Sequence, residues 1–267
     1  MIELTHFYGL KAEPFPQKVA IENLYMLPGL QALVDRVKFA VKNGVVSIIT
    51  GDVGSGKSTS LRYACSTFHP NEFSIISLVA TGGSLIELMR AILLQYGITY
   101  RSFQPAVAMK MVRDNILETV GRKEKPVLVI DEAHLLSQEL FTRLHTLAQF
   151  DFDSDPLLPI ILCGQDKLID RLSYPTARPL ASRVIGRSHL KALQLETMKA
   201  YIDHHLSLAG STKNPFSEEA ILAIHQGSGG LLRRANTLAR GAMIASAMEK
   251  CQVISGEHVR LASTEII

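Results

Sequence analysis

The chain has 267 residues, enough for one large domain or for a medium domain with a small one. Hydrophobic residues make up 47% of it and charged residues 20%, a composition that excludes intrinsic disorder. The net charge of +3 permits nucleic-acid binding without arguing strongly for it. No run approaches about 18 consecutive apolar residues, and the first residues lack basic and apolar signal regions. We therefore expect a cytoplasmic protein without a membrane span.

The N-terminal part of the chain combines an irregular stretch with the first regular elements. Residues 1–28 are rich in proline and are expected to form an irregular arm. Apolar residues at helical spacing predict a helix over residues 27–43, ended by Gly44. A β-branched run predicts a buried strand at residues 45–50, and a helix is expected at residues 59–68 after a glycine-rich loop.

Strand and helix patterns then alternate. We expect strands at residues 73–78, 127–132, 158–165 and 188–195, and helices at residues 84–96, 106–121, 135–150 and 167–172. This alternation predicts an α/β fold, a three-layer core with a parallel sheet over residues 29–195. Helical patterns alone follow, at residues 196–209, 217–226, 231–249 and 256–263, so a small all-α lid domain is predicted at residues 196–267.

The loop after the first strand fits the phosphate-binding pattern G-x-x-x-x-G-K-[ST], in the strand–loop–helix context that this pattern requires. Its residues are Gly51, Asp52, Val53, Gly54, Ser55, Gly56, Lys57, Ser58 and Thr59. Glycines let backbone N–H groups surround a phosphate, and the helix N-terminus adds positive potential. Lys57 is expected to bind the β- and γ-phosphates of ATP, and the Ser58 hydroxyl to bind Mg²⁺. The full spacing disfavours the alternative of a glycine-rich turn that binds nothing.

An acidic pair ends the strand predicted at residues 127–132. Asp131 is expected to hold Mg²⁺, directly or through water, and Glu132 to act as general base on the attacking water. The alternative is a solvated acidic strand end. His134 follows closely, and the residues leave open whether it senses the site or merely begins a helix.

Polar and basic residues later in the chain extend the predicted site. Gln165 ends a strand where its amide can orient water, although Gly-Gln can also be a simple turn. Arg178, Arg183 and Arg187 precede the last predicted strand. A ring-forming ATPase needs a cation at its neighbour's γ-phosphate, and we choose Arg183 for this role; a surface salt bridge is the alternative.

The predicted lid helix at residues 231–249 begins with two arginines, Arg233 and Arg234. An arginine in the first turn could contact the nucleotide of its own chain. Helical geometry alone does not choose between the two.

Taken together, these residues resemble the AAA+ superfamily, and more narrowly the ExeA-type family of general secretion pathway protein A ATPases. Residues 6–15, 51–58, 130–134 and 164–165 resemble that family's F-[YF]-G-L-x-x-x-P-F, T-G-x-V-G-[ST]-G-K-T, I-D-E-A-[QH] and G-Q patterns. Residues 181–184 fall at its [LQ]-x-R-[IV] arginine. Residues 230–236 resemble its G-x-P-R-x-[IL]-N pattern, with Leu232 in place of proline. Because Arg233 falls at the arginine of this pattern, the resemblance favours Arg233 over Arg234.

The proteins that this chain resembles fall into two groups with different functions. Secretion members carry a membrane span and a periplasmic cell-wall-binding domain after the ATPase, and we expect neither here. Stand-alone ATPases of this length are similar to transposition helpers of the TnsC, TniB and IstB type, which assemble on duplex DNA and recruit a transposase. We therefore expect an ATP-hydrolysing transposition regulator that forms a ring or filament of six subunits per turn. The alternative is an ATPase that acts on a protein partner without DNA.

Several further expectations depend on this interpretation. A DNA-binding assembly would contact phosphates through Arg101, Lys110, Arg113 and Lys123, although a solvated basic turn explains residues 122–125 equally well. Aromatic residues of the arm, Phe7, Tyr8 and Phe15, could contact adenine or a neighbouring subunit. The carboxylate of Glu132 disfavours a nucleotide switch with negligible turnover. The three cysteines are far apart and match no metal-binding motif.

Overall fold

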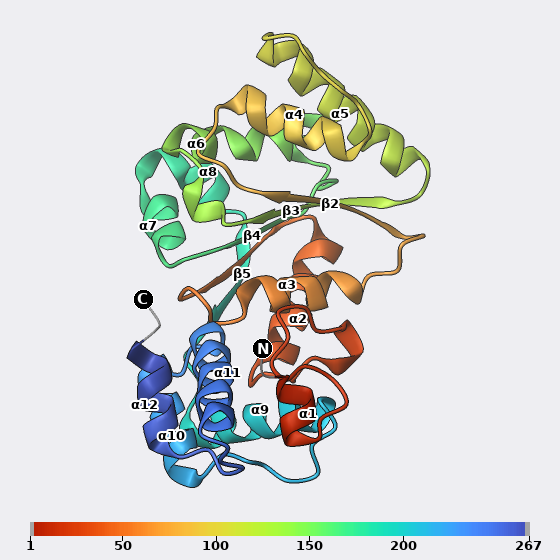
Figure 1. The fold of residues 1–267 in the computed structure, drawn as a ribbon. Helices are drawn as coiled ribbons and strands as arrows, with labels where there is room; N and C mark the ends of the chain where they lie inside the picture. The colour runs from red at the N-terminus through yellow and green to blue at the C-terminus, as the bar shows by residue number, and fades with distance from the viewer. Residues whose placement is uncertain (1–2, 265–267) are drawn as a thin grey trace. The chain divides into compact units, whose positions relative to one another are not determined.

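The computed structural model describes residues 3–264, which separate into two compact units (Figure 1). The α/β unit comprises Pro28–Gly51 and Lys57–Leu190. Of the described residues, the helical unit comprises residues 3–27, Asp52–Gly56 and residues 191–264. Among the described residues, no helix is both long enough and apolar enough to cross a membrane.

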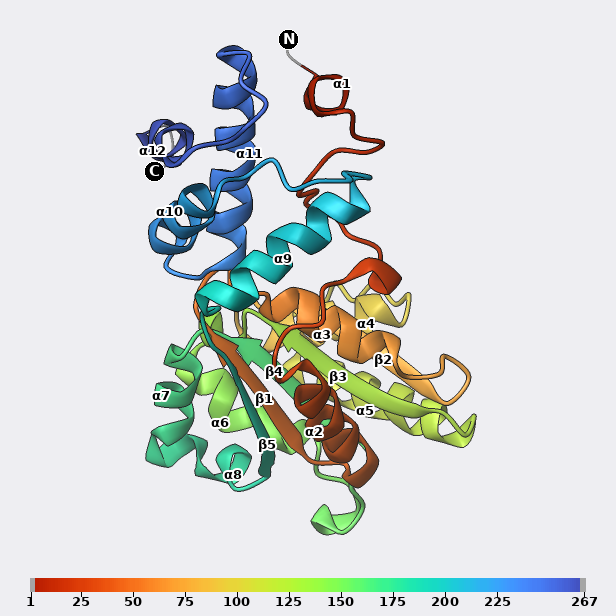
Figure 2. The same cartoon turned by 90° about the horizontal axis from the view of Figure 1, so that it is seen from below.

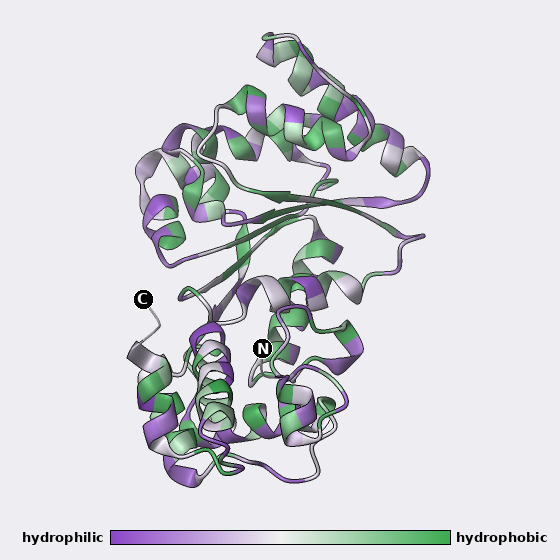
Figure 3. Cartoon of the chain, viewed as in Figure 1, coloured by the Kyte–Doolittle hydropathy of each residue, from purple (hydrophilic) through white to green (hydrophobic). Residues whose placement is uncertain are grey.

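A parallel sheet with the strand order β2-β3-β4-β1-β5 forms the middle layer of the α/β unit (Figure 2). The strands are β1 (Val46–Gly51), β2 (Phe73–Val79), β3 (Lys125–Asp131), β4 (Ile160–Gly164) and β5 (Val184–Leu190). All residues of β1 and β4 are buried, as befits strands covered on both faces. Figure 3 shows the strands as mostly hydrophobic. Because the strands are parallel, their carboxyl ends share one edge.

Helices cover both faces of this sheet, so the predicted three-layer α/β fold is confirmed (Figure 1). One face carries α2 (Leu30–Asn43) and α3 (Lys57–Ser66). The other carries α4 (Leu85–Gln95), α5 (Pro105–Gly121), α6 (Gln138–Leu147), α7 (Lys167–Ser173) and α8 (Arg178–Ala181), with the 3₁₀ turns η2 (Ala133–Leu135), η3 (Asp151–Asp153) and η4 (Pro175–Ala177). Fully buried residues such as Val37, Met89 and Phe141 fill the two interfaces.

Two predicted elements are displaced in the structure. The last strand begins at Val184 and not at Ser188. β5 is an edge strand whose side chains alternate between buried and exposed, so no continuous apolar run marks where it starts. The helix predicted at residues 135–150 is the shorter α6. Ser137 caps α6 by accepting the N–H of Leu140 at 3.3 Å, and η2 occupies the residues before it.

The helical unit contains α9 (Leu195–Leu208), α10 (Glu218–Ser228), α11 (Leu232–Met248) and α12 (Gly256–Thr264), as predicted. The N-terminal arm is more ordered than predicted, since it forms α1 (Leu4–Tyr8) and η1 (Ile21–Asn23). Phe15 is 2% exposed and stacks on His205 of α9, with ring centroids 5.4 Å apart. The Tyr8 hydroxyl donates to the carbonyl of Met243 at 3.0 Å. Phe15 is therefore a core residue and is not available to contact adenine or a neighbouring subunit, whereas Phe7 and Tyr8 are only partly buried.

Candidate active site

The phosphate-binding pattern begins at the end of β1 and runs into α3. Lys57 is the first residue of α3 and is 6% exposed, while Ser58 and Thr59 are exposed in the same turn. Gly54 and Gly56 have φ of 84° and 94°, values that residues with a side chain rarely adopt. Asp52 and Val53 between the strand and these glycines are exposed.

The hydroxyl of Ser55 is buried, and the described part of the chain offers it no hydrogen-bond partner. A buried polar group without a partner costs about 1–3 kcal/mol. A phosphate oxygen at this helix N-terminus would satisfy the hydroxyl. The loop therefore fits an anionic ligand such as the phosphates of ATP.

The acidic pair lies where β3 ends. The carboxylate of Asp131 accepts the backbone N–H of Glu132 at 2.8 Å. Glu132 has φ 51° and ψ 31°, a left-handed conformation that costs a non-glycine residue of the order of 1–3 kcal/mol and is concentrated at functional sites. Its side chain is 38% exposed, which leaves the carboxylate accessible to water.

Gln165 follows β4, which lies between β3 and β1 in the sheet. Its backbone N–H donates to Nδ1 of His134 at 3.3 Å. The same Nδ1 lies 3.3 Å from the carboxylate of Glu132. Burial lowers the pKa of His134, the charge of Glu132 opposes this, and the charge of Lys57 adds to the lowering. The Glu132 carboxylate and the backbone of Gln165 thus both contact the imidazole of His134 at the carboxyl edge of the sheet.

Ser58 and Asp131 are the residues that would hold Mg²⁺. They offer a hydroxyl and a carboxylate, the hard oxygen ligands that Mg²⁺ prefers. The Asp131 carboxylate uses one oxygen for the Glu132 N–H. The donor set therefore fits the ion that accompanies ATP.

Arg183 immediately precedes β5 and forms an ion pair with Asp153 of η3. The Arg183 side chain is 21% exposed. All three residues of η3, Asp151, Phe152 and Asp153, have positive φ, and Phe152 is fully exposed. The predicted arginine is therefore held by a strained loop of its own unit.

Arg233 is the second residue of α11, in the helical unit. Its backbone N–H donates to the carbonyl of Gly54 at 3.2 Å, and its side chain is exposed. The helix begins at Leu232 although the proline usual at this position is absent. The contact with the phosphate-binding loop therefore involves the backbone of Arg233, while its side chain stays available.

Of the four residues predicted to contact DNA, three are exposed and one is held by contacts within the chain. Arg101, Lys110 and Lys123 are exposed. Arg113 donates to the carbonyl of Thr146 at 3.1 Å, and its guanidinium lies 4.3 Å from the ring centroid of Phe150. Arg113 therefore packs α5 against α6 and the turn after it, and we remove it from the candidate set.

Two basic side chains of the charged turn after α5 also have partners within the chain. Arg122 pairs with Glu118 at 3.2 Å, and Lys125 donates to the carbonyl of Lys42 at 2.8 Å. Burial lowers the pKa of Lys125. Of the basic residues at 122–125, Lys123 alone stays a candidate for a phosphate contact.

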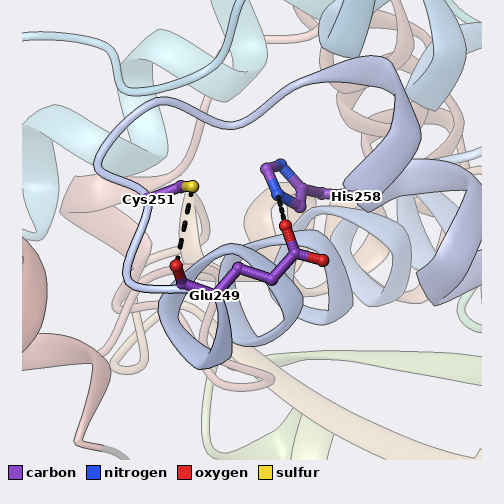
Figure 4. A group of neighbouring side chains, drawn as sticks. All are labelled: Glu249, Cys251 and His258. Carbon is purple, nitrogen blue, oxygen red and sulfur yellow. Dashed lines mark hydrogen bonds and ion pairs between the residues drawn. The ribbon is translucent and has the colours of Figure 1, made fainter.

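A second cluster of titratable side chains lies between α11 and α12 of the helical unit. Figure 4 shows Glu249, Cys251 and His258 pointing toward one another. The His258 Nδ1 accepts the N–H of Ser255 at 2.9 Å, so the ring proton lies on Nε2 and is donated to Glu249 at 3.0 Å. Both ring nitrogens are therefore used, and the cluster is best described as the cap of α12 and not as a metal site.

The fold and the site together define a nucleotide-binding domain with the AAA+ fold. Its features are a parallel sheet with the order β2-β3-β4-β1-β5, Lys57 in the segment after β1, and Asp131 and Glu132 at the end of β3. Residues 42–172 match the family model described as "AAA domain". This part of the chain is accordingly similar to P-loop ATPase domains of the AAA type.

Over 264 residues the chain is 27% identical to general secretion pathway protein A of Aeromonas hydrophila, a distant homologue. The match covers 98% of this chain and 48% of that protein, so the chain spans about half the length of its curated relative.

Solved structures share the fold. Cdc6p of Pyrobaculum aerophilum has a TM-score of 0.75 and 15% identity, covering 95% of this chain and 70% of that one. The ORC2 protein of Aeropyrum pernix has a TM-score of 0.70 and 17% identity, covering 94% of this chain and 71% of that one. At such identities these similarities show the fold alone.

Sequence reasoning missed the partners of several site residues. His134 joins Glu132 to Gln165, which lies 31 residues away along the chain. His189 of β5 lies 3.0 Å from the Thr50 hydroxyl and 3.2 Å from the Asp166 carboxylate, and so links the ends of β1, β4 and β5. The sequence places His134 after the acidic pair but gives no sign of its contact with Gln165, and no local pattern marks His189, because these contacts arise from the strand order.

Proposed function

We propose that the chain hydrolyses ATP and uses the nucleotide cycle to act on a protein partner. The buried Lys57 at the start of α3 and the half-exposed Glu132 beside His134 support hydrolysis. These two residues supply a cation for the phosphates and a carboxylate for the attacking water. A domain that only binds nucleotide has no need of the strained, half-exposed Glu132.

Each residue then has a defined task. Lys57 stabilises charge that develops on the β- and γ-phosphates. Glu132 accepts a proton from water, and the Gln165 side chain orients that water. Mg²⁺, held by Ser58 and Asp131, would neutralise phosphate charge when bound.

Self-association completes the proposed site. Arg183 would leave Asp153 and supply its charge to the γ-phosphate of a neighbouring copy. The exposed side chain of Arg233 would contact the nucleotide of its own chain. A ring or filament of six subunits per turn is the form we expect for this assembly.

The class of partner is proposed from the relative that matches the chain in sequence. The relative whose match covers 98% of this chain, at 27% identity, is named as a general secretion pathway protein, and this favours a protein partner over duplex DNA and a transposase. The exposed Arg101, Lys110 and Lys123 keep the prediction of DNA binding open to test.

Steady-state phosphate release by the purified chain tests hydrolysis, with Glu132→Gln as the inactive reference. We expect Mg²⁺-dependent release that duplex DNA does not stimulate. Capture with Glu132→Gln in ATP should retain a protein that Lys57→Ala does not retain. Salt-sensitive stimulation by DNA of any sequence would instead support the transposition interpretation. No release above the Glu132→Gln background would refute the proposed hydrolysis.

A further inference from the structure

His134 is a buried imidazole, 7% exposed, in the turn that follows the acidic pair. Its Nδ1 faces two groups at the same distance: it accepts the Gln165 N–H at 3.3 Å and lies 3.3 Å from the Glu132 carboxylate. One nitrogen therefore stands between the general base and the end of β4.

The hydrogen bond from Gln165 decides where the ring proton lies. A backbone N–H can only donate, so Nδ1 must offer its lone pair, and the proton of the neutral ring lies on Nε2. Nδ1 then has no proton to give to Glu132, and both carboxylate oxygens stay free to accept one from water. The Nδ1–H tautomer would do the reverse: it would bind Glu132 and lose the Gln165 N–H.

The surroundings favour the neutral ring. Burial lowers the pKa of His134, and Lys57 of α3 and Lys167 and Arg171 of α7 add to the lowering, against the opposing charge of Glu132. These are the charged groups that act on the ring from the elements around it. Protonation is therefore disfavoured at neutral pH.

Packing fixes the position of the ring. A Cβ atom at Gly164 would lie 3.0 Å from the backbone nitrogen of His134 and 3.2 Å from its Nδ1, closer than ordinary contacts. β4 and η2 thus approach each other at a position where only glycine fits without displacement. The ring therefore lies close against the backbone of β4, with Nδ1 beside both Glu132 and Gln165.

We propose that His134 is a positioning residue for the hydrolytic site, whose neutral Nε2–H tautomer holds the Gln165 N–H and leaves Glu132 free as a base. Through this one contact the end of β4 and the general base keep a common geometry. The catalytic part rests on the proposed hydrolysis of ATP. The tautomer and the hydrogen bond to Gln165 do not depend on it.

The first test needs no activity. Two-bond ¹H–¹⁵N correlation spectra of the uniformly ¹⁵N-labelled chain at pH 7.5 distinguish the two tautomers, and the His134 signals are those lost in His134→Asn. We expect the Nε2–H tautomer, and a Gln165 amide resonance that shifts in His134→Ala. The Nδ1–H tautomer, or an unchanged Gln165 amide, would overturn the proposal.

The second test separates positioning from folding. His134→Ala should lower kcat between tenfold and roughly 100-fold, the scale of a misplaced catalytic group, while the Kd for ATP stays within about twofold. In His134→Asn the side-chain oxygen can accept the Gln165 N–H, so most of kcat should return. The exposed His69→Ala serves as control.

These outcomes are distinguishable from failure of the proposed function. A wild-type chain without ATP hydrolysis refutes that function, and the spectra still decide the tautomer. Equal kcat in the wild type and in His134→Ala refutes the positioning role. A poorly folded His134→Ala leaves the wild-type spectrum and the His134→Asn kinetics to decide.

Discussion

The backbone N–H of Arg233 donates a hydrogen bond to the carbonyl of Gly54, and these two residues lie 179 positions apart in a chain whose phosphate-binding loop contains Gly54. A Cβ atom at Gly54 would lie 2.9 Å from the Cβ of Arg233, at a φ of 84°. The glycine is thus required twice, by its conformation and by the close approach of α11.

Gly54→Ala should weaken ATP binding at least tenfold, because the loop must shift away from Arg233 or abandon its left-handed conformation. Gly97→Ala is the matched control, since Gly97 has a φ of 76° and nothing within 4 Å of its Cβ position. Fluorescent-nucleotide titration measures both. If the two variants bind ATP alike, the approach of Arg233 plays no part.

Lys57→Ala should abolish measurable nucleotide binding. Lys57 is buried at the start of α3, where its charge offsets that of the phosphates. Isothermal titration calorimetry with ATP and Mg²⁺ checks this, and Lys38→Ala on the exposed face of α2 is the control. Wild-type affinity in Lys57→Ala would refute the assignment of the loop.

Glu132→Gln should keep ATP bound and reduce turnover at least 100-fold, the typical contribution of a positioned general base. The amide has nearly the shape of the carboxylate but accepts no proton from water. Phosphate release and ATP binding are measured on the same samples. Glu139→Gln, which changes an exposed carboxylate on α6, should be neutral. Unchanged turnover would remove Glu132 from this role.

Arg183→Ala should lose ATPase activity that returns in part on mixing with Lys57→Ala, because each variant can supply what its neighbour lacks. Asp153→Ala should raise activity at low protein concentration, since it releases Arg183 from its ion pair. Activity against mixing ratio is the measurement, with the exposed Arg143→Ala as control. An absence of rescue at every ratio would contradict action between copies.

The stability of the helical unit should fall in acid because of His205. Burial lowers the pKa of His205 to about 4, and the nearby His204 adds to the lowering. The unfolded chain, with a pKa of 6.5, binds the proton first, so stability present above pH 6.5 is lost as the pH falls toward 4. Between pH 7 and pH 5 this one group should cost about 2 kcal/mol of unfolding free energy.

Urea unfolding of the wild type and of His205→Phe at both pH values tests this. Phenylalanine keeps an aromatic ring beside Phe15 and Tyr201 but does not titrate. The wild type should lose more stability than the variant on acidification. Equal losses would show that other groups account for the acid sensitivity.

The sequence alone is sufficient to locate the motifs whose residues are contiguous in the chain. The loop at residues 51–59 and the strand that ends in Asp131 and Glu132 are contiguous, so spacing and periodicity within a few residues suffice to place them. The three-layer order of strands and helices follows from the same local signals, and the capping box that Ser84 and Glu87 form at the start of α4 is also local.

Tertiary structure decided which of these residues meet and which are engaged elsewhere. Four findings depend on the tertiary structure in this way. They are the ordering of the arm around Phe15, the packing of Arg113 on Phe150, the ion pair of Arg183 and the position of His134 beside Glu132 and Gln165. Each depends on segments brought together by strand order and core packing. Because such contacts join residues far apart in the chain, a local pattern of amino acids does not predict them.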